Sequence, residues 1–182
     1  SGDIKATNSG VIVTSGDNSF GVLLQTIGGG GGVGGSSSGI VNLNNTNSES
    51  DSGNINFNNS GTISTTGTGS HAVVAQTIAG GGGFVFGGVQ KENSDHQLDK
   101  PSGSSGDIKI TNTGTISASG DNAVALLFQN AAGGAYLYQN PDGSVSSVKD
   151  SSDKTDSSAG KVVVINSGNI IASGEGGVAI TK

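Results

Sequence analysis

The strongest constraint on this chain is an internal repeat. A segment rich in glycine, branched aliphatic residues and asparagine begins at Gly2, Gly53, Gly106 and Gly160, so its copies lie 51, 53 and 54 residues apart. Units of this kind bury their apolar faces only against their neighbours, and they therefore form elongated arrays. We interpret the chain, 1–182, as one elongated domain with repeats 2–52, 53–105 and 106–159 and a partial repeat, 160–182.

Aliphatic residues recur at fixed offsets within each copy, and polar residues mostly alternate with them. This alternation is typical of half-buried strands, and no sustained helical period competes with it. The sequence therefore predicts an all-β fold, a parallel β-helix (solenoid) in which three short strands per coil stack like over like. The recurring sets are Ile4, Ile55, Ile108 and Val162, then Ile12, Ile63, Ile116 and Ile170, and then Val22, Val73, Leu126 and Ile180.

Two further columns describe the turns and the polar interior. One position is asparagine in every copy, and strands stacked about 4.8 Å apart would join these amides into a structural ladder. A second position exchanges asparagine with glycine, which predicts a turn residue with positive φ. The ladder residues are Asn8, Asn59, Asn112 and Asn166, and the turn residues are Asn18, Gly69, Asn122 and Gly176.

The segments that follow Gln25, Gln76 and Gln129 differ among copies. Each opens with an apolar step and a glycine-rich run, and we predict hairpin excursions after it. The expected hairpins pair residues 84–86 with 89–91 and residues 136–138 with 144–146, with a weaker version between Val33 and residues 40–43. An alternative is that these segments form a second coil in each repeat.

Composition excludes several classes of function. The chain has no cysteine, which removes thiolate metal sites, thiol catalysis and disulfides. All eight basic residues are lysine and the net charge is -6, so we expect no nucleic-acid partner. No apolar run approaches the ~20 residues that span a bilayer, and we expect no membrane insertion of this segment. Because the fourth copy stops at Lys182, we expect a piece of a longer array.

Candidate chemical groups have simpler structural interpretations. The glycine run 28–35 lacks the lysine and hydroxyl residue of a phosphate-binding loop, and we predict a packing surface. His71 shares a column with Phe20 and should be packed, while His96 lies in a polar loop. Carboxylates recur only at turns, where they cap backbone groups. We therefore expect no enzyme, no metal and no cofactor. The carboxylate columns are Asp3 with Asp107, and Asp17 with Asp121 and Glu175.

Two aromatic pairs remain, Phe84 with Phe86 and Tyr136 with Tyr138. Alternation places both members of a pair on one face of a strand. The rings either fold over the glycine run or form an exposed patch for a partner. These four residues are our candidates for partner binding.

The repeat also resembles a known family. The residues Asn8-Ser9-Gly10, Ser15-Gly16-Asp17, Gly21-Val22 and 25–32 are similar to passenger repeats of bacterial autotransporter adhesins, the type V secreted proteins of Gram-negative outer membranes. The second copy keeps this motif over 59–83, while Asn130-Ala131-Ala132 interrupts it in the third, so about half of the chain is covered. The resemblance implies a right-handed β-helical stalk on the cell surface, anchored by a C-terminal barrel outside this segment. It carries over no functional residue.

Three functional hypotheses follow. The first is a segment of an extracellular adhesin that contributes to attachment, aggregation or biofilm by binding a host or neighbouring-cell protein or glycan, or by self-association. The second is an inert stalk segment whose binding head lies elsewhere. The third, a β-helical carbohydrate-active enzyme, requires carboxylates that converge on one face.

Overall fold

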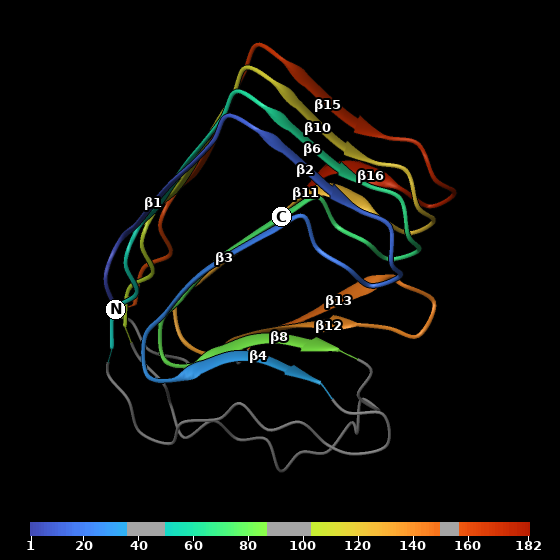
Figure 1. The fold of residues 1–182 in the computed structure, drawn as a ribbon. Helices are drawn as coiled ribbons and strands as arrows, with labels where there is room; N and C mark the ends of the chain where they lie inside the picture. The colour runs from blue at the N-terminus through green and yellow to red at the C-terminus, as the bar shows by residue number, and fades with distance from the viewer. Residues whose placement is uncertain (36–49, 87–102, 150–156) are drawn as a thin grey trace.

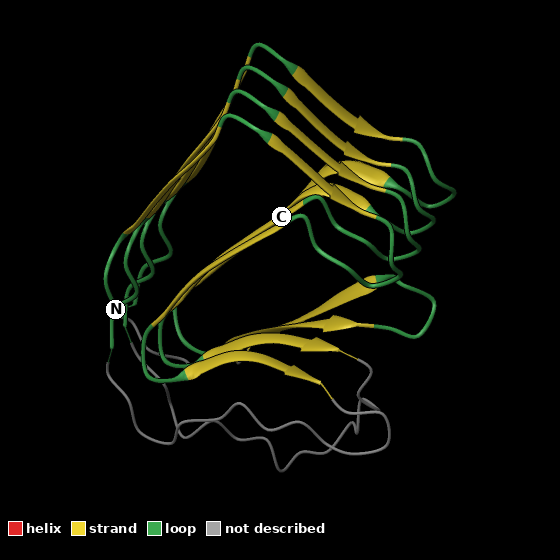
Figure 2. Ribbon diagram, viewed as in Figure 1, coloured by secondary structure: helices red, strands yellow, loops and turns green. Residues whose placement is uncertain are grey.

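The computed structural model describes residues 1–35, 50–86, 103–149 and 157–182. Every regular element in these ranges is a β-strand (Figure 2), which confirms the prediction of an all-β fold. The strands form four sheets of four strands each, and every pairing is parallel except that between β12 and β13.

Each full repeat contributes one strand to each sheet, except that the third contributes two strands, β12 and β13, to sheet D. Sheet A contains β1 (Ile4–Asn8), β5 (Ile55–Asn59), β9 (Ile108–Asn112) and β14 (Val162–Asn166), and sheet B contains β2 (Val11–Thr14), β6 (Thr62–Thr65), β10 (Thr115–Ala118) and β15 (Asn169–Ala172). Sheet C contains β3 (Val22–Ile27), β7 (Val73–Ile78), β11 (Val124–Ala131) and β16 (Val178–Thr181), and sheet D contains β4 (Gly31–Gly35), β8 (Gly82–Phe86), β12 (Ala135–Gln139) and β13 (Val145–Lys149).

Equivalent residues of successive copies lie side by side. Ile4 pairs with Ile55, Ile55 with Ile108, and Ile108 with Val162 in sheet A. The same like-over-like register joins Ile12 to its counterparts in sheet B. Figure 1 shows the equivalent strands as parallel ribbons stacked along one direction. The register predicted from the repeat is therefore confirmed.

Sheet C lies between two apolar cores. Figure 1 shows β3 of sheet C with the strands of sheets A and B on one side and those of sheet D on the other. The first core lies among sheets A, B and C and contains Ile55, Ile63 and Phe128 together with their neighbours in the columns. The second core lies between sheets C and D and contains Val74 and Phe84. Because both of its faces are covered, all six residues of β7 are buried. A parallel strand that is covered on both faces loses the alternation of buried and exposed residues. In β7 the polar residues Gln76 and Thr77 are buried together with the apolar ones.

The predicted turns and excursions have mixed outcomes. Asn18 and Asn122 have φ of 55° and 54°, and Gly69 and Gly176 have φ of 63° and 67°, as the exchange of asparagine with glycine predicts. The hairpin that contains Tyr136 is confirmed, because β12 and β13 pair antiparallel. Its predicted register is wrong: residues 136–138 pair with 146–148 and not with 144–146, because the turn lies one residue further along the chain than expected, between Gln139 and Val145.

The two other excursions lie partly outside the described residues. Residues 89–91 and 40–43, the expected hairpin partners in the first two copies, are not in the described ranges. The strands that precede them, β4 and β8, pair parallel with each other and with β12. The alternative of a second coil requires that the segments after Gln25, Gln76 and Gln129 stack in parallel from copy to copy. Sheet D shows such stacking for β4, β8 and β12.

Candidate functional site

The asparagine column is a continuous chain of side-chain hydrogen bonds. Asn8 Nδ2 donates to Asn59 Oδ1, Asn59 to Asn112, and Asn112 to Asn166, each at 2.8 Å. Asn59 and Asn112 also donate to the carbonyl oxygens of Gly61 and Gly114. The two central side chains are buried at 1% and 0% exposure. Their polar atoms are used within the fold, so this column is structural.

A second amide ladder was not predicted from the sequence. Gln25 donates to Gln76, and Gln76 Nε2 donates to Gln129 Oε1 at 2.8 Å. Gln76 also donates to the carbonyl oxygen of Gly83, which connects sheet C to sheet D across the second core. Gln129 donates instead to Ser147 Oγ on β13 at 3.3 Å. The signal for this ladder was present, since glutamine occupies the same offset in three copies.

The carboxylates at the turns also bind backbone, but they reach the following repeat. Asp3 Oδ1 accepts the amide of Asn54 at 2.8 Å, and Asp17 Oδ1 accepts that of Thr68 at 2.9 Å. The third copy repeats both contacts, at 2.7 Å from Asp107 to the amide of Lys161 and at 3.0 Å from Asp121 to that of Glu175. The expected role in capping their own turns is therefore replaced by a role between repeats.

The glycine-rich runs lead into the strands of sheet D, and in the first two copies their last glycines lie within β4 and β8. Gly82 and Gly83 have φ of +139° and +141°, a conformation that favours glycine. A Cβ at Gly82 would lie 1.9 Å from the carbonyl oxygen of Ala135 on the neighbouring strand. The run therefore permits close stacking of backbones, which is the packing interpretation given above and offers no phosphate cradle.

The two aromatic pairs face opposite sides of sheet D. Phe84 pairs with Leu137, whereas Tyr138 pairs with Val85. Phe84 and Phe86 therefore point into the second core, where their ring centroids lie 4.8 and 5.0 Å from that of Phe20. The other face carries Val85 and the two tyrosines, whose ring centroids are 5.9 Å apart.

Exposure distinguishes the members of each aromatic pair. Phe84 is 0% exposed and Tyr136 is 7% exposed, so neither ring can anchor a partner without rearrangement. Phe86 and Tyr138 are half-buried. Burial raises the pKa of the Tyr138 hydroxyl. Only these two second members keep the accessibility that partner binding requires.

The histidines were predicted to be packed and solvated, respectively. His71 is 0% exposed, and its ring stacks on that of Phe20 with a centroid separation of 5.7 Å. Burial lowers the pKa of His71 to about 4, so the ring is neutral near pH 7. His96 lies outside the described residues. Within the described ranges, no cluster of three or more histidine or acidic side chains could hold a metal ion.

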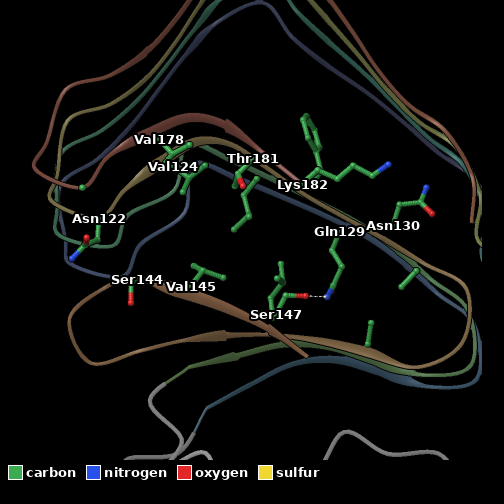
Figure 3. Close-up of a pocket in the computed structure, with 16 residues that line it drawn as sticks. Asn122, Val124, Gln129, Asn130, Ser144, Val145, Ser147, Val178, Thr181 and Lys182 are labelled. Atoms are coloured by element: carbon green, nitrogen blue, oxygen red, sulfur yellow. Dashed lines mark hydrogen bonds between the residues drawn. The ribbon is translucent and has the colours of Figure 1, made fainter. Parts of the chain in front are cut away.

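A cavity of about 540 Å³ lies between sheet C and the β12–β13 hairpin. Val124, Leu127 and Leu137 supply apolar walls, and Val145 enters from β13. Figure 3 shows Gln129 reaching Ser147 across it, with Lys182 at its border. Val124, one of the lining residues, stands in the column that holds the larger rings of Phe20 and His71 in the first two copies.

Comparison with known proteins adds no identification. No known protein family, curated protein or solved structure matches this chain. The part of the chain that the structure describes contains no helix long and apolar enough to cross a membrane.

Proposed function

We propose that residues 1–182 are a single elongated segment of a right-handed parallel β-helical stalk, with repeats of 51–54 residues, in a surface-exposed adhesin of a Gram-negative bacterium. The observation that supports this proposal best is the register of sheet A, in which four asparagines from four copies lie side by side. A stack of this kind extends by addition of repeats and gives reach. Attachment to a host or neighbouring-cell protein or glycan, or self-association, is its role.

The distribution of polar groups supports a scaffold without catalysis. Within each of the two ladders, the side-chain amides hydrogen-bond one another. The turn aspartates accept hydrogen bonds from backbone amides of the next repeat. An enzyme would instead need titratable groups free to contact a substrate. The excursions differ most among copies, and they are therefore the parts that can carry binding specificity.

The second candidate is an inert stalk segment. The burial of Phe84 and Tyr136 favours it, because half of the candidate aromatic residues are consumed by packing. The two candidates differ in what the isolated segment does. An adhesive segment binds, whereas an inert one only separates a head from the cell surface.

The experiment compares beads coated with the segment in an aggregation assay and on a glycan array. The first variant combines Phe86→Ser with Tyr138→Ser. The second variant is Tyr138→Ser alone, which leaves the contact between the rings of Phe86 and Phe20 intact. Asn58→Ser changes the exposed outer face of sheet A and serves as the matched control. We expect the parent and the control to bind, and Tyr138→Ser to lose binding with an unchanged melting curve.

Other outcomes separate the candidates. A parent segment that neither aggregates beads nor binds a glycan or a cell surface contradicts the adhesive role and supports the inert stalk. Binding that persists in both aromatic variants places the contact elsewhere on the surface. If the double variant unfolds while Tyr138→Ser does not, Phe86 is a core residue.

A further inference from the structure

His71 occupies a junction between three parts of the molecule. It lies in the turn that enters β7, and its Nδ1 accepts a hydrogen bond from the backbone amide of Val124 at 3.0 Å. Its Nε2 lies 3.4 Å from the side-chain amide of Gln139, the last residue of β12. A single buried ring therefore contacts β7's entry turn, β11 and the β12–β13 hairpin.

The tip of the hairpin is fixed at the same place. Gln139 donates to the carbonyl oxygens of Gly69 and Gly143, the latter at 3.2 Å. A Cβ on Gly69 would lie 2.5 Å from the Cα of Gly143, so the two backbones are in direct contact. Asn122 donates to the carbonyl oxygen of Asp142 at 2.8 Å. These contacts close the side of the second core at which the hairpin turns (Figure 1).

The hydrogen bond from Val124 requires an unprotonated Nδ1. Within the described residues, the ring contacts Phe20, Phe84, Val124 and Gln139, and none of these four residues carries a charge. The acidic group of the adjoining turn, Asp142, is exposed, and its carboxylate accepts hydrogen bonds from Ser144. A proton on His71 would therefore find no counter-charge among its contacts.

We propose that His71 is an acid-sensitive latch. When Nδ1 is protonated, its N–H faces the N–H of Val124, so that two donors meet and neither has an acceptor. The charged ring then leaves its buried position against Gln139, and the β12–β13 hairpin opens. A buried cation without a partner is costly, so the proton and the closed hairpin exclude each other. The lowered pKa of the buried ring is the thermodynamic counterpart of this exclusion.

The first core does not take part in the opening. Its buried residues come from sheets A, B and C and the turns that join them, and it contains no residue of β12 or β13. Opening the hairpin therefore uncovers Val74, Leu127 and Leu137 in the second core while the rest of the stack persists. The newly exposed apolar surface makes association of this segment acid-dependent.

Two adjacent residues of β7 report on the two cores separately. Val74 and Ala75 are both 0% exposed, and they face the second and the first core respectively. Because the chain has no cysteine, Val74→Cys and Ala75→Cys each introduce a single thiol. Labelling with 4,4′-dithiodipyridine, corrected with an unfolded cysteine peptide, measures how often each site opens. If Ala75→Cys does not fold, Ala118→Cys on β10 reports on the first core.

We expect both thiols to be protected at pH 7. Between pH 6.5 and about 4, labelling of Val74→Cys rises by about tenfold for each pH unit, because the open form binds one proton more. Ala75→Cys stays protected over this range. The variant His71→Phe carries phenylalanine, as the first copy does at the equivalent Phe20. When Val74→Cys is combined with His71→Phe, we expect the thiol to stay protected over the same pH range.

Three outcomes overturn the proposal. Simultaneous exposure of both thiols means global unfolding and no latch. Protection of Val74→Cys at pH 4 means that the hairpin does not open. Acid-dependent labelling that persists in His71→Phe assigns the effect to another group, since His96 and Asp142 remain in that variant.

Discussion

Replacement of Asn112 by alanine tests how the stacked copies hold together. Asn112 accepts from Asn59 and donates to Asn166, both at 2.8 Å, and it also donates to Gly114 at 3.2 Å. Each such bond contributes about 1 kcal/mol net, and a buried partner left unsatisfied costs about 1–3 kcal/mol. Asn59 keeps its bond to Gly61, which limits that second cost. We therefore expect Asn112→Ala to lower the free energy of unfolding by roughly 3 kcal/mol.

Two matched variants calibrate this value. Asn8 has one ladder partner and is only half-buried, so Asn8→Ala should cost about 1 kcal/mol. Thr111 precedes Asn112 on β9 and is partly exposed, and Thr111→Ala should change stability by less than about 0.5 kcal/mol. The assay is urea unfolding followed by far-UV circular dichroism at pH 7. Equal losses in Asn8→Ala and Asn112→Ala would refute the ladder, because each amide would then act only within its own turn.

Three further perturbations follow from burial, backbone geometry and pKa. Ile116→Asp buries a carboxylate without a partner and should unfold the central repeats, whereas Ser117→Asp, on the outer face, should leave circular dichroism and melting nearly unchanged. Gly82→Ala should cost more than about 3 kcal/mol in urea unfolding because its Cβ would lie 1.9 Å from a carbonyl oxygen, while Gly32→Ala, with φ of +139° but open space, should cost only about 1–2 kcal/mol. Acid should destabilise the fold: the pKa of His71 is about 4 when folded and 6.5 when unfolded, so the unfolded chain binds the proton first as pH falls. Urea midpoints should therefore show a loss approaching about 3 kcal/mol between pH 7 and 4 that His71→Phe removes.

The sequence predicts what equivalent copies share. Ile4, Ile55 and Ile108 lie in one column because identical offsets give identical register in parallel strands. The positive φ of Asn18 and Gly69 follows from the same logic, since asparagine and glycine exchange where the left-handed conformation is required. Such features depend only on comparison of one copy with the next.

The second core could not be predicted in the same way. In β7, Val73, Val74 and Ala75 are all buried because sheet D covers the face that alternation would leave exposed. The faces of the aromatic residues depend on the length of the glycine run. Counting from Gln76 and Gln129, Phe84 aligns with Leu137 and not with Tyr136, so the two pairs point in opposite directions.

Val124 is the repeat equivalent of His71, but Gln139, the other hydrogen-bonding neighbour of the ring, is not related to them by the repeat. The bond between His71 and Val124 crosses from the second copy to the third, and Gln139 belongs to a hairpin present in the described part of only one copy. No offset within a single copy brings these three residues together. Only the folded arrangement of the hairpin against the turn at Gly69 does so.

The central claim, that the copies stack in register, is tested most directly by cysteine cross-linking on the outer face of sheet A. Asn58 pairs with Thr111, and parallel neighbours lie about 4.8 Å apart, within the range that a disulfide bridges. Asn58 and Lys109 are two residues out of register and about 8 Å apart, beyond that range. In this cysteine-free chain, mild oxidation should cross-link Asn58→Cys with Thr111→Cys and leave Asn58→Cys with Lys109→Cys reduced, as measured by the mass of proteolytic fragments. Cross-linking of the second pair at an equal or greater rate would contradict the register on which the whole account rests.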